Sequence, residues 1–243
     1  MFYNYDKRII YAVLIIMAVF GLRNYIYNPS LIVNLLLTIP GVVIAITLHE
    51  FAHAFAADKL GDDTPRVQGR LSLNPLAHID PIGFMMLVFA GFGWGKPVNV
   101  NPRSYSRKLT MERANAIVSA AGPLINFVLA IIFTVVYFLL YRFTGIGQNH
   151  IGTICVNIIL NTVIINIGLG VFNLIPLPPL DGSKIIRIFL PYNAKTWFDN
   201  NEYIFYAVFV LLWISGIAGT IISPIINSIF KGLMSLGMLI FHI

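Results

Sequence analysis

Residues 31–57, "LIVNLLLTIPGVVIAITLHEFAHAFAA", form an apolar stretch with a single charged residue, Glu50, toward its end. About 20 predominantly apolar residues are enough for a helix to cross the hydrocarbon core of a bilayer, so we predict a transmembrane helix here. An ionisable side chain inside such a helix is energetically costly and by default marks a functional site. The stretch therefore predicts both a membrane fold and a site within it.

The composition of the whole chain is also that of a membrane protein. Of its 243 residues, 58% are hydrophobic and 11% are charged, and the mean hydropathy is +0.81, whereas a soluble domain carries about 25% charged residues. The net charge of +6 is better explained by cytoplasmic loops than by nucleic-acid binding, because such loops are rich in Lys and Arg. The single Cys155 excludes an internal disulfide. We predict an all-α polytopic membrane protein. We expect the lipid bilayer to be its partner, and we expect no nucleic-acid partner.

Hydrophobic length predicts about six transmembrane helices, at 9–22, 31–57, 114–141, 151–175, 203–222 and 224–243. The segment 82–95, "IGFMMLVFAGFGWG", is too short and too rich in glycine for a full crossing, so we expect it to be re-entrant. We expect Pro224 to separate the last two helices.

The distribution of Lys and Arg predicts the orientation of these helices. Thirteen of these residues fall in the N-terminus, 58–113 and 181–202, against two, Arg23 and Arg142, on the opposite side. Because cytoplasmic loops carry the excess of basic residues, we expect a multi-pass plasma-membrane protein with a cytoplasmic N-terminus. His49 then lies about 13–14 Å below the cytoplasmic end of its helix, at about 1.5 Å per residue.

Residues 49–53, His-Glu-Phe-Ala-His, match the pattern H-E-x-x-H. On a helix, His49 and His53 share one face, so both imidazoles can bind one metal ion. Glu50 is placed to take a proton from a water molecule at that metal. With the few His and Glu in this chain, a chance match is on the order of one in a thousand.

Asp181 is the strongest candidate for a third metal ligand. Catalytic zinc sites normally use three protein ligands and keep one position open. Asp181 ends a run, 143–180, that contains no Asp, Glu, Lys or Arg. Prolines at 176, 178 and 179 break the helix before it and can turn Asp181 back toward the bundle. The alternative is that Asp181 is the N-cap of the helix that follows.

Three motifs, in this order along the chain, resemble those of the site-2 protease family of intramembrane zinc metalloproteases. They are HEFAH (49–53), "SAAGPLIN" (119–126) and "NLIPLPPLDG" (173–182). The segment "GRLSLNPLAHIDPIG" (69–83) resembles the bacterial and archaeal branch of the family. The resemblance covers about 31–190, and no loop is long enough for the PDZ-like or nucleotide-sensing domains of other members.

The resemblance implies a role for six residues. It assigns one Zn²⁺ per chain to His49, His53 and Asp181, and it makes Glu50 the general base. It also places Asn126 and Asn173 at the active site, where we expect them to bind substrate. The implied architecture is a single protease domain over 1–243, with its catalytic core at about 31–190 and the helices 9–22, 203–222 and 224–243 at its periphery.

Two segments between the motifs alternate between polar and apolar residues over a few positions, as short strands do. They are "RVQGRLSL" (66–73) and "KPVNVNP" (96–102), on the same side as the predicted zinc. We expect them to form a short β-hairpin on the cytoplasmic side. The hairpin either offers an edge to which an unwound substrate adds as a strand or only plugs the bundle. His78 lies between them and is expected to have a structural role, and Asn157, Asn161 and Asn166 are expected to bond between helices.

The sequence therefore predicts an intramembrane zinc metalloendopeptidase that cleaves transmembrane segments of other proteins. A zinc transporter is one alternative, but it needs ligands leading to both faces, and Glu50 and Asp181 are the only acids expected in the spans. The other alternative is a catalytically inactive homologue that binds membrane proteins. Proteoliposome zinc flux separates transport from hydrolysis.

The predicted orientation is testable by labelling. In a Cys155→Ser background, cysteines placed at Ser72 and Ser104 should be shielded from membrane-impermeant thiol reagents in intact cells, whereas one at Gln148 should react. The opposite labelling pattern would invert the topology and place the site toward the external face.

Overall fold

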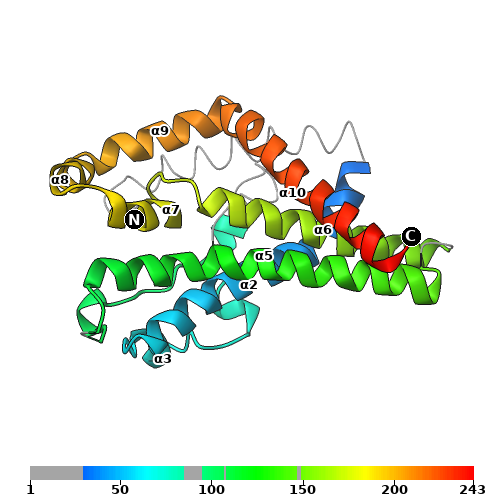
Figure 1. Ribbon diagram of the computed structural model, residues 1–243, viewed down its shortest axis with the longest axis horizontal. Coiled ribbons are helices and arrows are strands. Elements are labelled where there is room, and N and C mark those ends of the chain that lie inside the picture. The colour runs from blue at the N-terminus through cyan, green and yellow to red at the C-terminus, as the bar shows by residue number, and fades with distance from the viewer. Residues whose placement is uncertain (1–29, 85–94, 107, 147–148) are drawn as a thin grey trace.

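The computed structural model describes residues 30–84, 95–106, 108–146 and 149–243 (Figure 1). Within these residues the protein is mostly helical. The α-helices are α2 (Ser30–Lys59), α3 (Thr64–Val67), α5 (Met111–Thr144), α6 (His150–Asn173), α7 (Asp181–Ile186), α8 (Tyr192–Asn200), α9 (Glu202–Ile214) and α10 (Ile217–Phe241). Short 3₁₀ helices are η1 (Pro75–Ala77), η2 (Pro102–Ser104) and η3 (Arg187–Phe189).

Four of the described helices, α2, α5, α6 and α10, are long and apolar enough to cross a membrane. The first three match the spans predicted at 31–57, 114–141 and 151–175. Local sequence fixes their ends: the Thr110 side chain accepts a hydrogen bond from the backbone N–H of Arg113 at the start of α5. Asn149 does the same for Gly152 at the start of α6. The prediction of an all-α membrane protein is confirmed.

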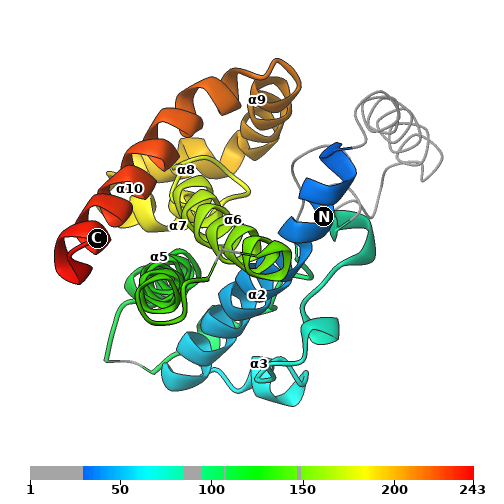
Figure 2. The ribbon, with the colours of Figure 1, turned by 90° about the vertical axis from the view of Figure 1, so that its right-hand side faces the viewer.

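The helices α2, α5 and α6 pack against one another, with α10 against α5 and α6 (Figure 2). The helix α2 runs opposite to α5, and α6 returns beside it (Figure 1). A buried apolar cluster joins α5, α6 and α10; it consists of Ala130, Val163, Ile167, Val171 and Ile222. A second cluster joins the end of α2 to the start of α5 and the loop before it; it consists of Ala57, Tyr105, Ala114 and Val118.

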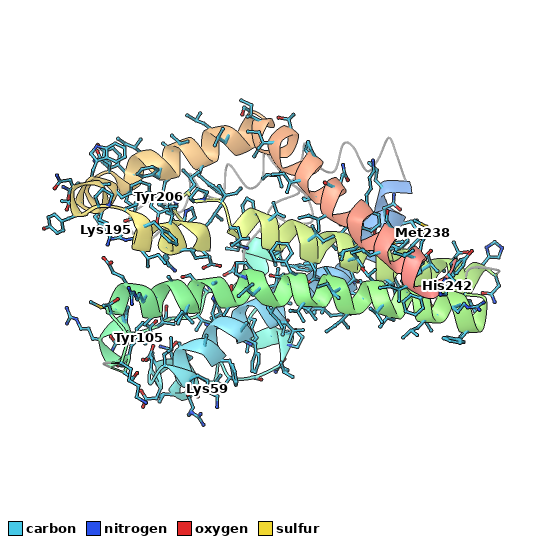
Figure 3. All side chains as sticks on the ribbon, viewed as in Figure 1. Lys59, Tyr105, Lys195, Tyr206, Met238 and His242 are labelled. Atoms are coloured by element: carbon cyan, nitrogen blue, oxygen red, sulfur yellow. The ribbon has the colours of Figure 1, made fainter. Side chains whose placement is uncertain are left out.

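The connections gather at two ends of this bundle. The helix α3, the start of α5, α7 and α8 lie at one end, whereas the end of α5, the start of α6 and the C-terminus lie at the other (Figure 1). Figure 3 shows Lys59, Tyr105 and Lys195 at the first end and His242 at the second. Apart from Arg142 and Lys231, the described Lys and Arg lie in the stretches 59–113 and 184–195. Charged residues of both signs are therefore concentrated in or near these two stretches.

The prediction of two crossings after residue 202 is wrong. The helix α9 has 13 residues, or about 20 Å at 1.5 Å per residue, which is too short for the roughly 30 Å of the hydrocarbon core. The helices α9 and α10 run from the α8 end to the opposite end as one bent path (Figure 1). The break lies at Gly216, whose φ of 74° is accessible to glycine, whereas Pro224 lies inside α10.

The expected β-hairpin is also not formed, because the described residues contain no strand and only an isolated bridge between Ile79 and Gly95. The first segment begins in α3. In the second, backbone N–H groups have partners other than a neighbouring strand: Val98 donates to Glu50 and Asn101 donates to Asp62. The predicted helix 9–22 and most of the re-entrant segment 82–95 lie outside the described residues.

Candidate metal centre

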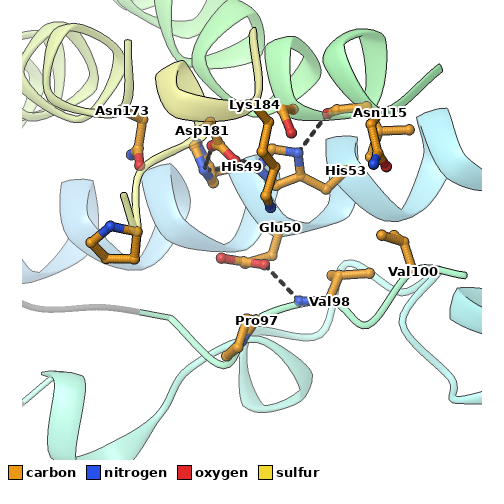
Figure 4. A pocket seen from close by; sticks show the side chains of 13 residues that line it. His49, Glu50, His53, Pro97, Val98, Val100, Asn115, Asn173, Asp181 and Lys184 are labelled. Atoms are coloured by element: carbon orange, nitrogen blue, oxygen red, sulfur yellow. Dashed lines mark hydrogen bonds and ion pairs between the residues drawn. The ribbon is translucent and has the colours of Figure 1, made fainter. Parts of the chain in front are cut away.

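His49, His53 and Asp181 bring three potential ligand atoms together inside the bundle (Figure 4). The two Nε2 atoms are 3.0 Å apart. Asp181 Oδ2 is 3.2 Å from His49 Nε2 and 3.1 Å from His53 Nε2. Both histidines are buried and Asp181 is half-buried. Among the described residues this is the one group of three His, Cys, Asp or Glu side chains close enough to share an ion.

The two histidines come from one face of α2, as the spacing of four residues requires. Asp181 reaches them from a different part of the chain. The helix α6 ends at Asn173, the proline-containing segment 174–180 turns the chain, and Asp181 is the first residue of α7. The N-cap position belongs to Leu180, and the Asp181 carboxylate lies against the two histidines. The structure therefore favours the predicted ligand position of Asp181 over the N-cap alternative.

The helix α5 orients both imidazole rings. Asn126 Oδ1 lies 2.7 Å from His49 Nδ1, and the Val118 carbonyl oxygen lies 2.7 Å from His53 Nδ1. Gly122, midway between these two positions, lets the α5 backbone approach the rings, since an added Cβ would lie 2.4 Å from His53 Nε2. Any larger residue at 122 would have to displace the histidines.

This donor set fits a zinc ion. Because each Nδ1 faces an oxygen acceptor, each neutral ring carries its proton on Nδ1 and turns the lone pair of Nε2 toward Asp181. Two lone pairs and a carboxylate oxygen at 3.0–3.2 Å repel one another unless a cation lies between them. These separations are close to the edge of about 3.3 Å expected for a tetrahedron with Zn–N and Zn–O bonds of about 2.0–2.1 Å.

Glu50 lies beside this group, half-buried on the same helix. Its Oε2 accepts a hydrogen bond of 3.1 Å from the backbone N–H of Val98 (Figure 4). Glu50 and the three clustered residues line a cavity of about 180 Å³. The rest of its wall is formed by Pro97, Val98, Val100, Asn115, Val118, Ser119, Asn173, Pro179 and Lys184. The carboxylate is therefore held next to the candidate ligands in a space that can admit another group.

The polar residues predicted to bind substrate differ in position. Asn173 lines the cavity, and its Nδ2 donates to the Leu169 carbonyl within α6. Asn126 is fully buried and its amide is engaged by His49, Ala45 and Asn166. This arrangement favours a supporting role for Asn126 over the predicted contact with substrate.

His78 lies apart from the cluster, and its Nε2 is 2.6 Å from the carbonyl oxygen of Ser72. It is fully buried in the loop that follows α3. This position agrees with the structural role predicted for it.

Sequence reasoning missed several residues of the cavity wall. Val98 meets Glu50 through its backbone, for which the sequence has no signal. Lys184 follows Asp181 by three residues, a spacing that places both on one side of α7. Asn115 accepts a hydrogen bond from the Tyr105 hydroxyl at 3.2 Å. Burial, and then the charge of Asp62, raise the pKa of Tyr105 to about 12.

Comparison with known proteins agrees with this geometry. Two relatives are named "Putative zinc metalloprotease": YwhC of Bacillus subtilis (strain 168) and Rip2 of Mycolicibacterium smegmatis. YwhC is 35% identical over 209 residues, which cover 84% of this chain and 91% of YwhC. Rip2 is 32% identical over 182 residues, which cover 73% of this chain and 66% of Rip2. No solved structure matches the chain.

The model of peptidase family M50 matches residues 37–215, which include every residue of the clustered site. The predicted resemblance and the predicted zinc cofactor are both confirmed. The chain belongs to peptidase family M50, the site-2 protease family of membrane zinc metalloproteases.

Proposed function

We propose that this protein is an intramembrane endopeptidase that cleaves transmembrane segments of other proteins, with His49, His53 and Asp181 as the ligands of one zinc ion. The observation that carries the proposal is the convergence of these three side chains beside Glu50 within a membrane-spanning bundle. A soluble peptidase would have no reason to bury this chemistry among apolar helices. The zinc, when bound, acts as a Lewis acid that polarises the scissile carbonyl and acidifies water at the site.

Glu50 is the proposed general base. Its carboxylate takes the proton from the attacking water and later gives it to the leaving amine. The N–H of Val98 holds Oε2, so the carboxylate keeps a fixed position while the other oxygen remains to accept the proton. Lys184 adds a positive charge to the same cavity wall, where it can attract the oxyanion that develops on the substrate carbonyl.

The proposed orientation puts the α3, α7 and α8 end of the bundle in the cytoplasm, because the described Lys and Arg, apart from Arg142 and Lys231, lie in the stretches 59–113 and 184–195 that include these helices. The protein would then be a multi-pass plasma-membrane enzyme whose site opens toward the cytoplasmic side. Since α9 and α10 cross together, the C-terminus would be external. The N-terminus would lie on the cytoplasmic side, and the helix at 9–22 and the re-entrant segment at 82–95 stay predictions from the sequence.

A helical substrate must unwind before its peptide carbonyls can be attacked, because a transmembrane helix engages them in hydrogen bonds. The residues Pro97, Val98 and Val100 run along the cavity opposite the histidines. We propose that the unwound substrate adds as a strand beside this segment and so replaces its lost backbone bonds.

Replacing Glu50 by Gln should abolish proteolysis while leaving zinc bound. The Gln amide oxygen still accepts from the N–H of Val98, but the amide cannot act as a base. We expect turnover of a fluorescent transmembrane peptide in proteoliposomes to fall by roughly 10²–10⁴-fold, with stoichiometric zinc by elemental analysis. Glu202→Gln, on α9, serves as the matched control. Substantial cleavage by the Glu50 variant would remove Glu50 from the mechanism, and zinc flux without cleavage in the wild type would favour a transporter.

Removing a proposed ligand should abolish zinc binding, which Glu50→Gln should retain. His49→Ala, His53→Ala and Asp181→Ala each delete a donor atom, so the purified proteins should lose zinc as well as activity. His150→Ala, at the start of α6 and outside the cluster, should keep both. If Asp181→Ala retained zinc as tightly as the wild type, the third ligand would have to be another residue.

Proline substitutions test strand addition because proline has no N–H to donate. Asn99→Pro should lower turnover by up to about tenfold, the value of one hydrogen bond, with zinc content unchanged, whereas Asn99→Ala should be neutral. Val98→Pro also removes the donor to Glu50. A loss confined to Val98→Pro would assign the effect to Glu50 and leave the segment as a plug.

A further inference from the structure

A chain of buried amides runs from α6 through α5 to the first histidine. Asn166 Nδ2 donates to the Thr162 carbonyl at 2.8 Å. Asn126 Nδ2 donates to Asn166 Oδ1 at 3.0 Å and to the Ala45 carbonyl at 3.2 Å. Asn126 Oδ1 then faces His49 Nδ1 at 2.7 Å. Both asparagines are fully buried, so bulk water is excluded from them.

The two backbone carbonyls give this chain a single direction. A carbonyl oxygen only accepts, so the NH₂ group of Asn166 must face Thr162 and the NH₂ group of Asn126 must face Ala45. The amide oxygen of Asn166 then faces Asn126, and the amide oxygen of Asn126 faces His49. Turning either amide over would oppose oxygen to oxygen in a buried space, where unsatisfied polar groups are costly.

This direction determines which nitrogen of His49 carries the proton. An amide oxygen at 2.7 Å requires Nδ1 to be the donor, which leaves the Nε2 lone pair directed at His53 and Asp181. The tautomer of a metal-binding histidine is commonly fixed by the partner of its other nitrogen. Here that partner is itself held by two acceptors, the Ala45 carbonyl at 3.2 Å and, on a third helix, Asn166 at the shorter distance of 3.0 Å.

We propose that Asn166, acting through Asn126, is a positioning residue that holds His49 in the tautomer able to bind zinc. The inference rests on the proposed role of His49 as a ligand. The competing explanation is that Asn166 only packs α6 against α5, in which case the direction of its amide has no effect on the metal.

Zinc affinity of purified full-length variants, measured by competition with a chelator, distinguishes these explanations without using activity. Asn166→Leu leaves the Asn126 amide held only by its longer bond to the Ala45 carbonyl, so it should weaken zinc binding by about tenfold, the lower end of the range for losing a partner of a ligating histidine. Asn166→Asp, neutral in this buried position, donates its O–H to the Thr162 carbonyl and still presents an oxygen to Asn126, so it should bind zinc nearly as tightly as the wild type. Asn157→Leu, an exposed position on the same helix, should leave affinity unchanged.

The same logic applies at Asn126. Asn126→Asp, likewise neutral, keeps an acceptor for His49 and one O–H donor toward Ala45 or Asn166, so it should largely retain zinc, whereas Asn126→Leu should lose affinity. If Asn126 only contacted substrate, neither variant would change zinc binding. Asn166→Ala carries the same expectation as Asn166→Leu and replaces it if the leucine variant does not fold.

The proposal is overturned if Asn166→Asp weakens zinc binding as much as Asn166→Leu, or if neither weakens it. His49→Ala separates this failure from failure of the proposed function. Loss of zinc in His49→Ala combined with wild-type affinity in Asn166→Leu would refute only the positioning role. Retention of zinc in His49→Ala would refute the ligand assignment itself.

Discussion

The pairing of α2 with α5 is the contact on which the site depends. The two helices run in opposite directions, so His53 meets the Val118 carbonyl and His49 meets Asn126, with Gly122 between them. Positions 118, 122 and 126 are one helical turn apart and lie on one face of α5. A shift of either helix by one turn would leave both Nδ1 atoms without these partners and bring a side chain against the rings. The register of two apolar helices is therefore set by polar contacts, which are more specific than the uniform packing of apolar surfaces in lipid.

Much of the site could be predicted from the sequence because its signals are local or rest on exclusion. His49, Glu50 and His53 follow from helical spacing. Asp181 follows from the small number of acids near the predicted spans. The partners of these residues were not predictable. Val98 contributes only a backbone N–H, and nothing in the sequence distinguishes Asn166 from the other polar residues of α6. Its importance comes from where α6 packs, and that depends on the contacts of the whole bundle.

The fold, too, was predictable where its signals are local and not where it depends on long-range contacts. The long spans α2, α5 and α6 follow from apolar length, and their ends from capping residues such as Thr110 and Asn149. The hairpin prediction failed because alternation is weak over so few residues and because carboxylates replaced the expected strand partner: Asp62 and Glu50 accept from the 96–101 segment. The sequence predicts the break between the last two helices at Pro224, but it lies at Gly216. A membrane helix can accommodate a proline, whereas the positive φ of Gly216 ends the helix.

The proposed ligands are widely separated in the order of synthesis. His49 and His53 belong to α2, whereas Asp181 follows α6 and the proline-containing turn. A chain emerging from the ribosome therefore holds only two of the three donors until α5 and α6 have entered the membrane. A site with only two of its three proposed ligands would bind zinc more weakly, so metal acquisition would be a late step of biogenesis. It would be completed only when the bundle that encloses the cavity is already assembled, and the nascent chain would remain inert toward neighbouring membrane proteins until then.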